Sequence, residues 1–311
     1  MKTVITIIAL GFIMTSCGDS AVDIAGESKN ENDLTRGNLN GKVSSINEAS
    51  YSALEKFGEV EKEKLLAKYT SKYDEQGSRI EINSYNSDST LVYKYTAKYD
   101  DQGNMIESNN EDSDHGLDTR HTSKYDELGN MIESNDYNSD GSLEKRYISQ
   151  YDELGNMIES NDYNSDGSLE KRYTSKYDDH GNTIENNDYN SDGSLEKRYT
   201  YKYDGQDNMI ESNGYNSDSS LSYRYISKYD DRGNMIESIE YSSDGAIVLE
   251  ETFMYDKQGN IIESNTYEEG AESERFTYRY EYDKIGNWIM RVGYIDNKAN
   301  EISERKIEYY Q

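Results

Sequence analysis

Short runs rich in Tyr, Ile, Thr and Met alternate with polar turn sequences from about residue 42 to the C-terminus. One turn sequence is Asp-x-x-Gly-Asn, as at residues 152–156, and the other is Asn-Ser-Asp-Gly-Ser, as at residues 164–168. Runs of about nine to eleven residues with this composition favour β-strands over helices. In both turns Asp or Asn can cap the turn, and Gly can adopt the left-handed conformation before the next strand begins. The pattern therefore predicts β-hairpins with three-residue loops and a glycine bulge.

The hairpins belong to an internal repeat. The dipeptide Tyr-Asp recurs with a step of 26 residues and, at the last copy, 27. Its nine tyrosines are Tyr73, Tyr99, Tyr125, Tyr151, Tyr177, Tyr203, Tyr229, Tyr255 and Tyr282. A repeat of this length corresponds to one structural unit that buries its surface against its neighbours.

Pairing across the turns predicts which residues share a face of the sheet. The turns place Tyr151 opposite Met157 and Tyr163 opposite Leu169, and strict alternation then gives one tyrosine-rich face, which we expect to be the more buried. This predicted face contains Tyr151, Met157, Glu159, Asn161, Tyr163, Leu169, Lys171 and Tyr173. A recurrent Glu at Glu81, Glu107, Glu133, Glu159, Glu185, Glu211, Glu237 and Glu263 is expected to bond tyrosine hydroxyls or Lys145, Lys171 and Lys197 as a structural group.

The predicted fold class is all-β. Strands of unequal length shift the register by two residues per repeat, so a meander of about 18 to 20 strands should coil into a twisted, tubular or shell-like sheet with its tyrosines inward. We expect capping strands at residues 42–72, repeats at 73–281, and the last repeat with a C-terminal cap at 282–311. Residues 103–124 form a degenerate copy in which loops or a locally altered surface are expected.

The N-terminus has the features of an export signal. Lys2 precedes an apolar run that ends in Met14-Thr15-Ser16-Cys17, which is similar to the lipobox of bacterial lipoproteins. We therefore expect a signal peptide at 1–16, lipidation of Cys17, and a flexible tether at 17–41 that is rich in Ser, Asn, Asp and Glu. An ordinary secretory signal with a chance Cys is the alternative. The expected location is the bacterial cell envelope, with the protein anchored to the outer membrane on its periplasmic or surface face.

The amino-acid composition limits the classes of partner that we expect. The formal net charge is −29, which disfavours nucleic acid and anionic membrane surfaces through repulsion, so we expect no nucleic-acid partner. Hydrophobic residues make up only 33% of the chain, but 31 tyrosines supply apolar surface that suits half-exposed strands. The expected membrane contact is through the lipid on Cys17, and no cofactor is expected.

The repeated Tyr-Asp-x-x-Gly-Asn followed by an apolar pair resembles the YD repeat of the RHS family. The resemblance covers about residues 69–311 and rests on nine copies. It implies a strand spiral that forms a hollow shell, in some members around a C-terminal toxin domain. This chain ends in Gly286-Asn287-Trp288 and a charged strand, so it resembles the short lipoprotein members, whose function is generally unassigned.

The stretch DYNSDGSLEKRY, present three times, suggests calcium ligands. Its opening resembles the first half of an EF-hand loop, but Tyr147 occupies the position of the bidentate Glu and the flanks are strands. We interpret this stretch as a repeated turn and keep weak calcium binding as an alternative. The candidate ligands are Asp136, Asn138, Asp140, Asp162, Asn164, Asp166, Asp188, Asn190 and Asp192.

Catalysis has little support in the sequence, since no histidine spacing matches a zinc site or a catalytic triad. We expect a non-catalytic membrane-anchored repeat scaffold that binds a protein or a glycan. The alternative is a structural or immunity-like accessory of an RHS-type system. Exposed tyrosines would stack on sugars or anchor an interface; the candidates are Tyr137, Tyr147, Tyr163, Tyr173, Tyr189 and Tyr199.

Overall fold

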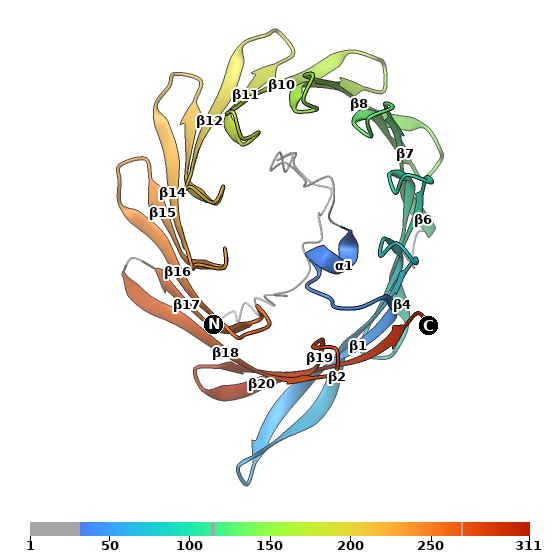
Figure 1. Ribbon diagram of the computed structural model, residues 1–311, viewed down its shortest axis with the longest axis vertical. Coiled ribbons are helices and arrows are strands. Elements are labelled where there is room, and N and C mark those ends of the chain that lie inside the picture. Colours follow the sequence, from blue (N-terminus) through green and yellow to red (C-terminus); the bar gives the residue numbers. More distant parts are fainter. Residues whose placement is uncertain (1–31, 113–115, 269) are drawn as a thin grey trace.

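Twenty antiparallel strands form a closed sheet in the computed structural model, which describes residues 32–112, 116–268 and 270–311. Each strand pairs with the next one along the chain, and the sheet encircles the short helix α1 (Asp33–Arg36) (Figure 1). The strands are β1 (Val43–Lys56), β2 (Glu59–Tyr73), β3 (Arg79–Tyr85), β4 (Leu91–Tyr99), β5 (Met105–Asp112), β6 (Gly116–Tyr125), β7 (Met131–Asn138), β8 (Leu143–Tyr151), β9 (Met157–Asn164), β10 (Leu169–Tyr177), β11 (Thr183–Asn190), β12 (Leu195–Tyr203), β13 (Met209–Asn216), β14 (Leu221–Tyr229), β15 (Met235–Ser242), β16 (Ile247–Tyr255), β17 (Ile261–Glu268), β18 (Ala271–Tyr282), β19 (Trp288–Ile295) and β20 (Lys298–Tyr309). The predicted all-β tubular meander is confirmed.

The two ends of the meander close the ring on each other. β1 pairs with both β2 and β20, with Ile46 opposite Ile307 and Glu48 opposite Arg305. Residues 42–72 and 282–311, expected as caps at two ends of the sheet, instead pair with each other and leave no free edge between them. The loops expected in the degenerate copy are contradicted over its described residues, since β5 and β6 pair like their neighbours.

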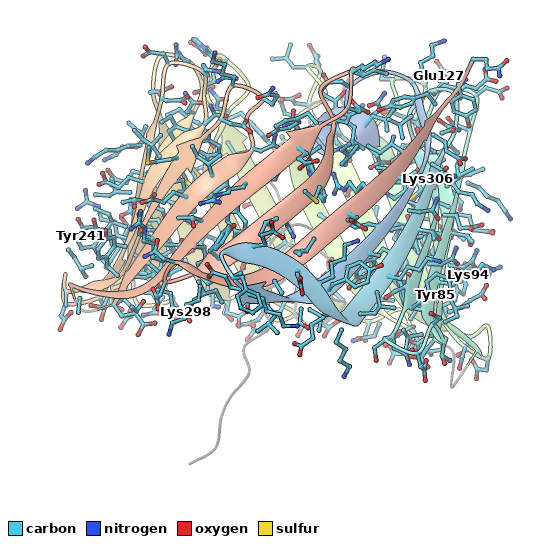
Figure 2. The ribbon with its side chains drawn as sticks, turned by 90° about the horizontal axis from the view of Figure 1, so that it is seen from below. Tyr85, Lys94, Glu127, Tyr241, Lys298 and Lys306 are labelled. Carbon is cyan, nitrogen blue, oxygen red and sulfur yellow. The ribbon has the colours of Figure 1, made fainter. Side chains whose placement is uncertain are left out.

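Both turn sequences fold as the sequence predicts. In the first, Asp152 N–H donates to Asn156 O and Gly155 N–H donates to Asp152 O, at 2.9 and 3.1 Å. Gly155 has φ of 81°, a left-handed conformation that favours glycine. The Asp152 carboxylate accepts the N–H of Asn156 at 2.8 Å, so the local side chains supply the turn's hydrogen bonds. Glu127 in a turn of this type and Lys298 at the start of β20 mark opposite rims of the ring (Figure 2).

A bulge beside each turn changes which residues share a face. Tyr151 pairs with Met157 and Tyr163 pairs with Leu169, as predicted. One step further in, however, Gln150 pairs with Glu159, so Ile158 is the extra residue of a bulge. Likewise Lys171 pairs with Asp162, which leaves Glu170 as an extra residue. The predicted tyrosine-rich face was therefore wrong as a single surface: Tyr151, Lys171 and Tyr173 lie on one face, and Glu159, Asn161 and Tyr163 lie on the other.

The helix identifies the inner face. Leu34 of α1, which lies within the ring (Figure 1), packs with Val43, Ile46 and Tyr73 in a small apolar core. Following the register from Ile46 around the ring assigns Tyr147 and Tyr173 to this inner face. Tyr85, Lys94 and Tyr241 mark the opposite, outer face of the wall (Figure 2).

Residues 32–41 are attached to the ring. Asn32 Nδ2 donates to Gln76 O at 2.7 Å, and Asn38 Nδ2 donates to Gln258 O at 2.9 Å. Asn40 N–H donates to Asn287 Oδ1 at 2.7 Å. The expected tether at 17–41 was therefore wrong for its last ten residues, which contact three of the Tyr-Asp turns. The signal peptide, Cys17 and the rest of the tether lie outside the described residues.

The tyrosine of the Tyr-Asp dipeptide joins neighbouring repeats. Tyr151 Oη donates to Met131 O at 2.8 Å, and Tyr177 Oη donates to Met157 O at 2.8 Å. The same bond occurs at Tyr99, Tyr125, Tyr203, Tyr229 and Tyr255. Each bond reaches a residue 20 positions earlier, so the hydroxyl explains why tyrosine rather than phenylalanine recurs here.

Replacing Tyr151 by phenylalanine should lower the free energy of unfolding by about 1 kcal/mol, because the bond to Met131 O is lost while the ring stays. Tyr189→Phe is the matched control, since no hydrogen bond to the Tyr189 hydroxyl occurs among the described residues. Denaturant melts of the full-length protein compare the two variants. Equal effects of both would contradict the role assigned to the hydroxyl.

Candidate binding surface on the inner face

The recurrent Glu lies on the outer face, in ion pairs between adjacent strands. Lys176 Nζ lies 2.7 Å from Glu185 Oε1, and hydrogen bonds from Asn187 and Lys176 lower the pKa of Glu185. The equivalent pairs are Lys72–Glu81, Lys98–Glu107, Lys124–Glu133, Lys202–Glu211 and Lys228–Glu237. The expected partners Lys145, Lys171 and Lys197 were wrong because the bulges turn those lysines to the inner face. Exposed pairs of this kind contribute little stability individually.

Arginine side chains cover several outer tyrosines. The Arg120 guanidinium lies 4.5 Å from the centroid of the Tyr137 ring, and that of Arg172 lies 4.6 Å from the Tyr189 ring. Cation–π contacts of this geometry occupy a ring face that a ligand would otherwise use. Tyr163 occupies the same outer face.

The six candidate tyrosines do not form one surface. Tyr137, Tyr163 and Tyr189 face outward, whereas Tyr147, Tyr173 and Tyr199 face inward. The expectation of a shared binding face was wrong for the same physical reason as above: the bulge beside each turn inverts the alternation.

On the inner face several tyrosines lie beside carboxylates. Tyr147 Oη donates to Asp136 Oδ2 at 3.2 Å, and Tyr225 Oη donates to Glu240 Oε2 at 2.8 Å. Tyr173 and Tyr199 continue the row of inner tyrosines, with Tyr173 opposite Asp188 in the register. His121 of the degenerate copy adds a bond from Nδ1 to Asp136 Oδ1 at 2.6 Å. The result is a row of aromatic rings and carboxylates along the inside of the ring.

Inner lysines connect successive repeats. Lys145 Nζ lies 3.1 Å from Glu170 Oε2, and Lys171 Nζ lies 3.0 Å from Glu196 Oε2. Glu170 is a bulge residue, so the bulge that inverts the faces also brings this carboxylate to the inner lysine. Strict alternation along the sequence could not have found this pair.

The candidate calcium ligands have separate positions. Asp136, Asp162 and Asp188 face inward, away from the turn that follows each of them. In the turn, Asp140 Oδ1 accepts the N–H of Ser142 at 2.9 Å, and hydrogen bonds from Ser142 lower the pKa of Asp140. Asn138, Asn164 and Asn190 each donate to the Ser that ends their turn, and Asp166 and Asp192 repeat the contact of Asp140. In the part of the chain that the structure describes, no three metal-ligating side chains gather.

The sequence reasoning missed several inner residues, namely Gly214, Tyr201, Tyr223, Tyr225 and Glu240. The signal that could have found them is a departure from the repeat. Gly214 replaces the Asp of the three preceding copies, and Tyr223 replaces their Lys.

Comparison with known proteins gives distant matches among solved structures. No family model matches the chain, and no curated protein matches it. Among solved structures, the Photorhabdus luminescens Tc holotoxin pore is 12% identical with a TM-score of 0.39, over 82% of this chain and 15% of that chain. A porin-like protein from Bacteroides uniformis is 10% identical with a TM-score of 0.37, over 86% of this chain and 96% of that chain. This chain therefore spans less than a sixth of the toxin chain. Across residues 32–112, 116–268 and 270–311, no helix is long and apolar enough to cross a membrane.

Proposed function

We propose that this protein is a non-catalytic scaffold, anchored to the bacterial outer membrane through Cys17, which binds a glycan on the inner face of its ring. The observation that carries the proposal is the row of inner tyrosines with carboxylates beside them, such as Tyr147 with Asp136 and Tyr225 with Glu240. Tyr147 and Tyr199 are half-buried, so solvent reaches both rings, and the Tyr147 hydroxyl is held by Asp136. We also propose that the chain belongs to the short lipoprotein type of YD-repeat protein, which its nine repeats support.

The chemistry of the inner face suits a sugar. Aromatic rings pack against the C–H faces of a pyranose, and carboxylates accept hydrogen bonds from its hydroxyls. The outer face offers neither group freely, because arginines cover Tyr137 and Tyr189 and lysines pair with the recurrent Glu. Residues 32–41, which include α1, lie along the rim of Tyr-Asp turns, where they bond Gln76, Gln258 and Asn287, and they obstruct the entry of a folded protein from this side. A narrow polysaccharide chain is therefore the ligand that we favour.

Glycan binding should depend on inner tyrosines and not on outer ones. Tyr147→Ala combined with Tyr199→Ala should weaken binding roughly tenfold or more, because two aromatic contacts are lost. The matched control, Tyr137→Ala with Tyr189→Ala, should leave the affinity within about twofold. Isothermal titration of the full-length protein with chitohexaose and cellohexaose measures both. Equal losses in the two double variants, or no binding of either sugar by the unaltered protein, would count against the proposal.

A further inference from the structure

Departures from the repeat converge on one part of the inner face. Gly214 on β13 stands where three other copies have Asp136, Asp162 and Asp188. Two neighbouring positions change as well: Tyr223 on β14 replaces the inner lysine, and Tyr201 on β12 replaces a serine. All three lie on adjacent strands, with Gly214 opposite both Tyr199 and Tyr223.

The glycine makes room for an aromatic ring. A Cβ atom at Gly214 would lie 2.4 Å from Cε1 of Tyr223, closer than atoms can approach. The Tyr223 ring therefore rests directly on the backbone of β13, in space that any side chain at position 214 would occupy. Tyr225 meets this ring edge-on, with centroids 5.4 Å apart and an interplanar angle of 72°. The two substitutions are thus coupled: tyrosine fits here because the aspartate is gone.

Hydrogen bonds fix the tyrosines of this group, which we call the Gly214 cluster (Gly214, Tyr199, Tyr201, Tyr223 and Tyr225). Asn186 Nδ2 donates to Tyr201 Oη at 3.3 Å, and Tyr225 Oη donates to Glu240 Oε2 at 2.8 Å. The Tyr223 ring is held by packing against the Gly214 backbone and the Tyr225 ring. All four side chains are half-buried, so their rings are held in place and still accessible.

The charge around the cluster selects against anions. Glu240 bonds Tyr225 directly, and burial together with Glu240 raises the pKa of Tyr225 to about 12, so the phenol stays neutral. Lys197 stands opposite Asp188 in the register, which offsets its charge. In the preceding repeats the inner lysine binds a Glu, but the corresponding residue here is Ser222. An uncharged ligand rich in hydroxyl groups fits this environment better than an acidic one.

We propose that the Gly214 cluster is a saccharide subsite that stacks one uncharged pyranose ring of the bound glycan. The inference rests on the proposed glycan-binding function and assigns it a location and a sugar class. Tyr223 and Tyr199 supply the aromatic surface, and Glu240 accepts hydrogen bonds from sugar hydroxyls. The remaining inner carboxylates disfavour uronic acids.

The test gives positions 214 and 223 the residues that the preceding repeats carry there. The double variant Gly214→Asp with Tyr223→Lys recreates the pair that the same fold already carries at Asp162 and Lys171, so it should fold and melt like the unaltered protein. Tyr215→Ala is the control on the same strand, because Tyr215 is an outer residue under Arg198. Isothermal titration uses the full-length protein with chitohexaose, cellohexaose and hexagalacturonate.

The double variant Gly214→Asp with Tyr223→Lys should bind the neutral hexasaccharide at least tenfold more weakly than the unaltered protein does. The affinity of Tyr215→Ala for this sugar should lie within about twofold of the unaltered value. Hexagalacturonate should bind the unaltered protein more weakly than either neutral sugar. Tyr223→Phe should retain most of the affinity, because the ring remains. Unchanged affinity in the double variant would overturn the subsite and leave the glycan-binding function standing. Failure of the unaltered protein to bind any of the three sugars would overturn both.

Discussion

Replacing Arg305 by alanine should lower the free energy of unfolding by roughly 3–5 kcal/mol, because it leaves a carboxylate buried without its partner. Arg305 Nε lies 2.7 Å from Glu48 Oε2 across the junction of β20 and β1, and the two side chains are only 11% and 14% exposed. The guanidinium also lies 3.4 Å from the centroid of the Trp288 ring. Removal of Arg305 therefore takes away both the counter-ion and the aromatic contact at the place where the ring closes.

Two variants separate the buried pair from a surface effect. Lys306→Ala removes an exposed ion pair with Glu308 on the same strand and should leave the free energy of unfolding nearly unchanged. Arg305→Met with Glu48→Leu replaces the whole pair by apolar groups and should recover much of the loss. Denaturant melts give the free energies, and hydrogen exchange in β1 and β20 shows whether the junction opens. A loss in Arg305→Ala as small as that in Lys306→Ala would refute the argument.

Local chemistry explains what the sequence could predict. The turns depend on residues within five positions of each other, such as Asp152 and Gly155, so their type and the strand pairs beside them could be inferred directly. The period of 26 then gave the number of strands to within two. Fold class follows from these local signals because each repeat has the same structure.

The faces of the sheet could not be predicted, because one extra residue decides them. Ile158 and Glu170 sit in bulges that strict alternation ignores, and each bulge moves the following side chains to the other face. This single effect places Tyr137 on the outer face and Tyr147 on the inner face. It also pairs the recurrent Glu with other lysines than the expected Lys145, Lys171 and Lys197. Strict alternation of side chains along the strands therefore assigns residues to the wrong face beyond each bulge, including those that form the inner surface.

Closure of the ring and the position of residues 32–41 depend on contacts distant in sequence. Asn40 bonds Asn287, which is 247 residues away, and no local pattern reports such a contact. The composition of residues 32–41 is typical of a tether, but three of its asparagines find partners on the turns. A polar segment of this kind becomes ordered only when a complementary surface is present.

The Asp162→Asn variant should be more stable than the unaltered protein above about pH 6, by up to roughly 3 kcal/mol, and equally stable below about pH 4. Burial raises the pKa of Asp162 to about 6, against an ordinary value of 3.8, although the nearby Lys145 and Lys171 oppose the shift. Between pH 4 and 6 the folded protein binds more protons at this site than the unfolded chain does. Stability therefore falls as pH rises through this window, and asparagine, which carries no charge, escapes the penalty.

Asp166, four residues further on, provides a control in which the substitution should have the opposite effect on stability. Hydrogen bonds from Ser168 lower the pKa of Asp166 in the turn, so its ionised form stabilises the fold at neutral pH and this contribution is lost in acid. Asp166→Asn should thus be destabilising at pH 7 and neutral at low pH. Thermal melts of both variants and of the unaltered protein between pH 3 and pH 8 measure how the stability difference changes with pH.

A pH-independent effect of Asp162→Asn would contradict the prediction. Opposite slopes would show that the two aspartates of one duplicated hairpin have different roles, since Asp166 holds the turn whereas Asp162 is kept on the inner face at a cost in stability.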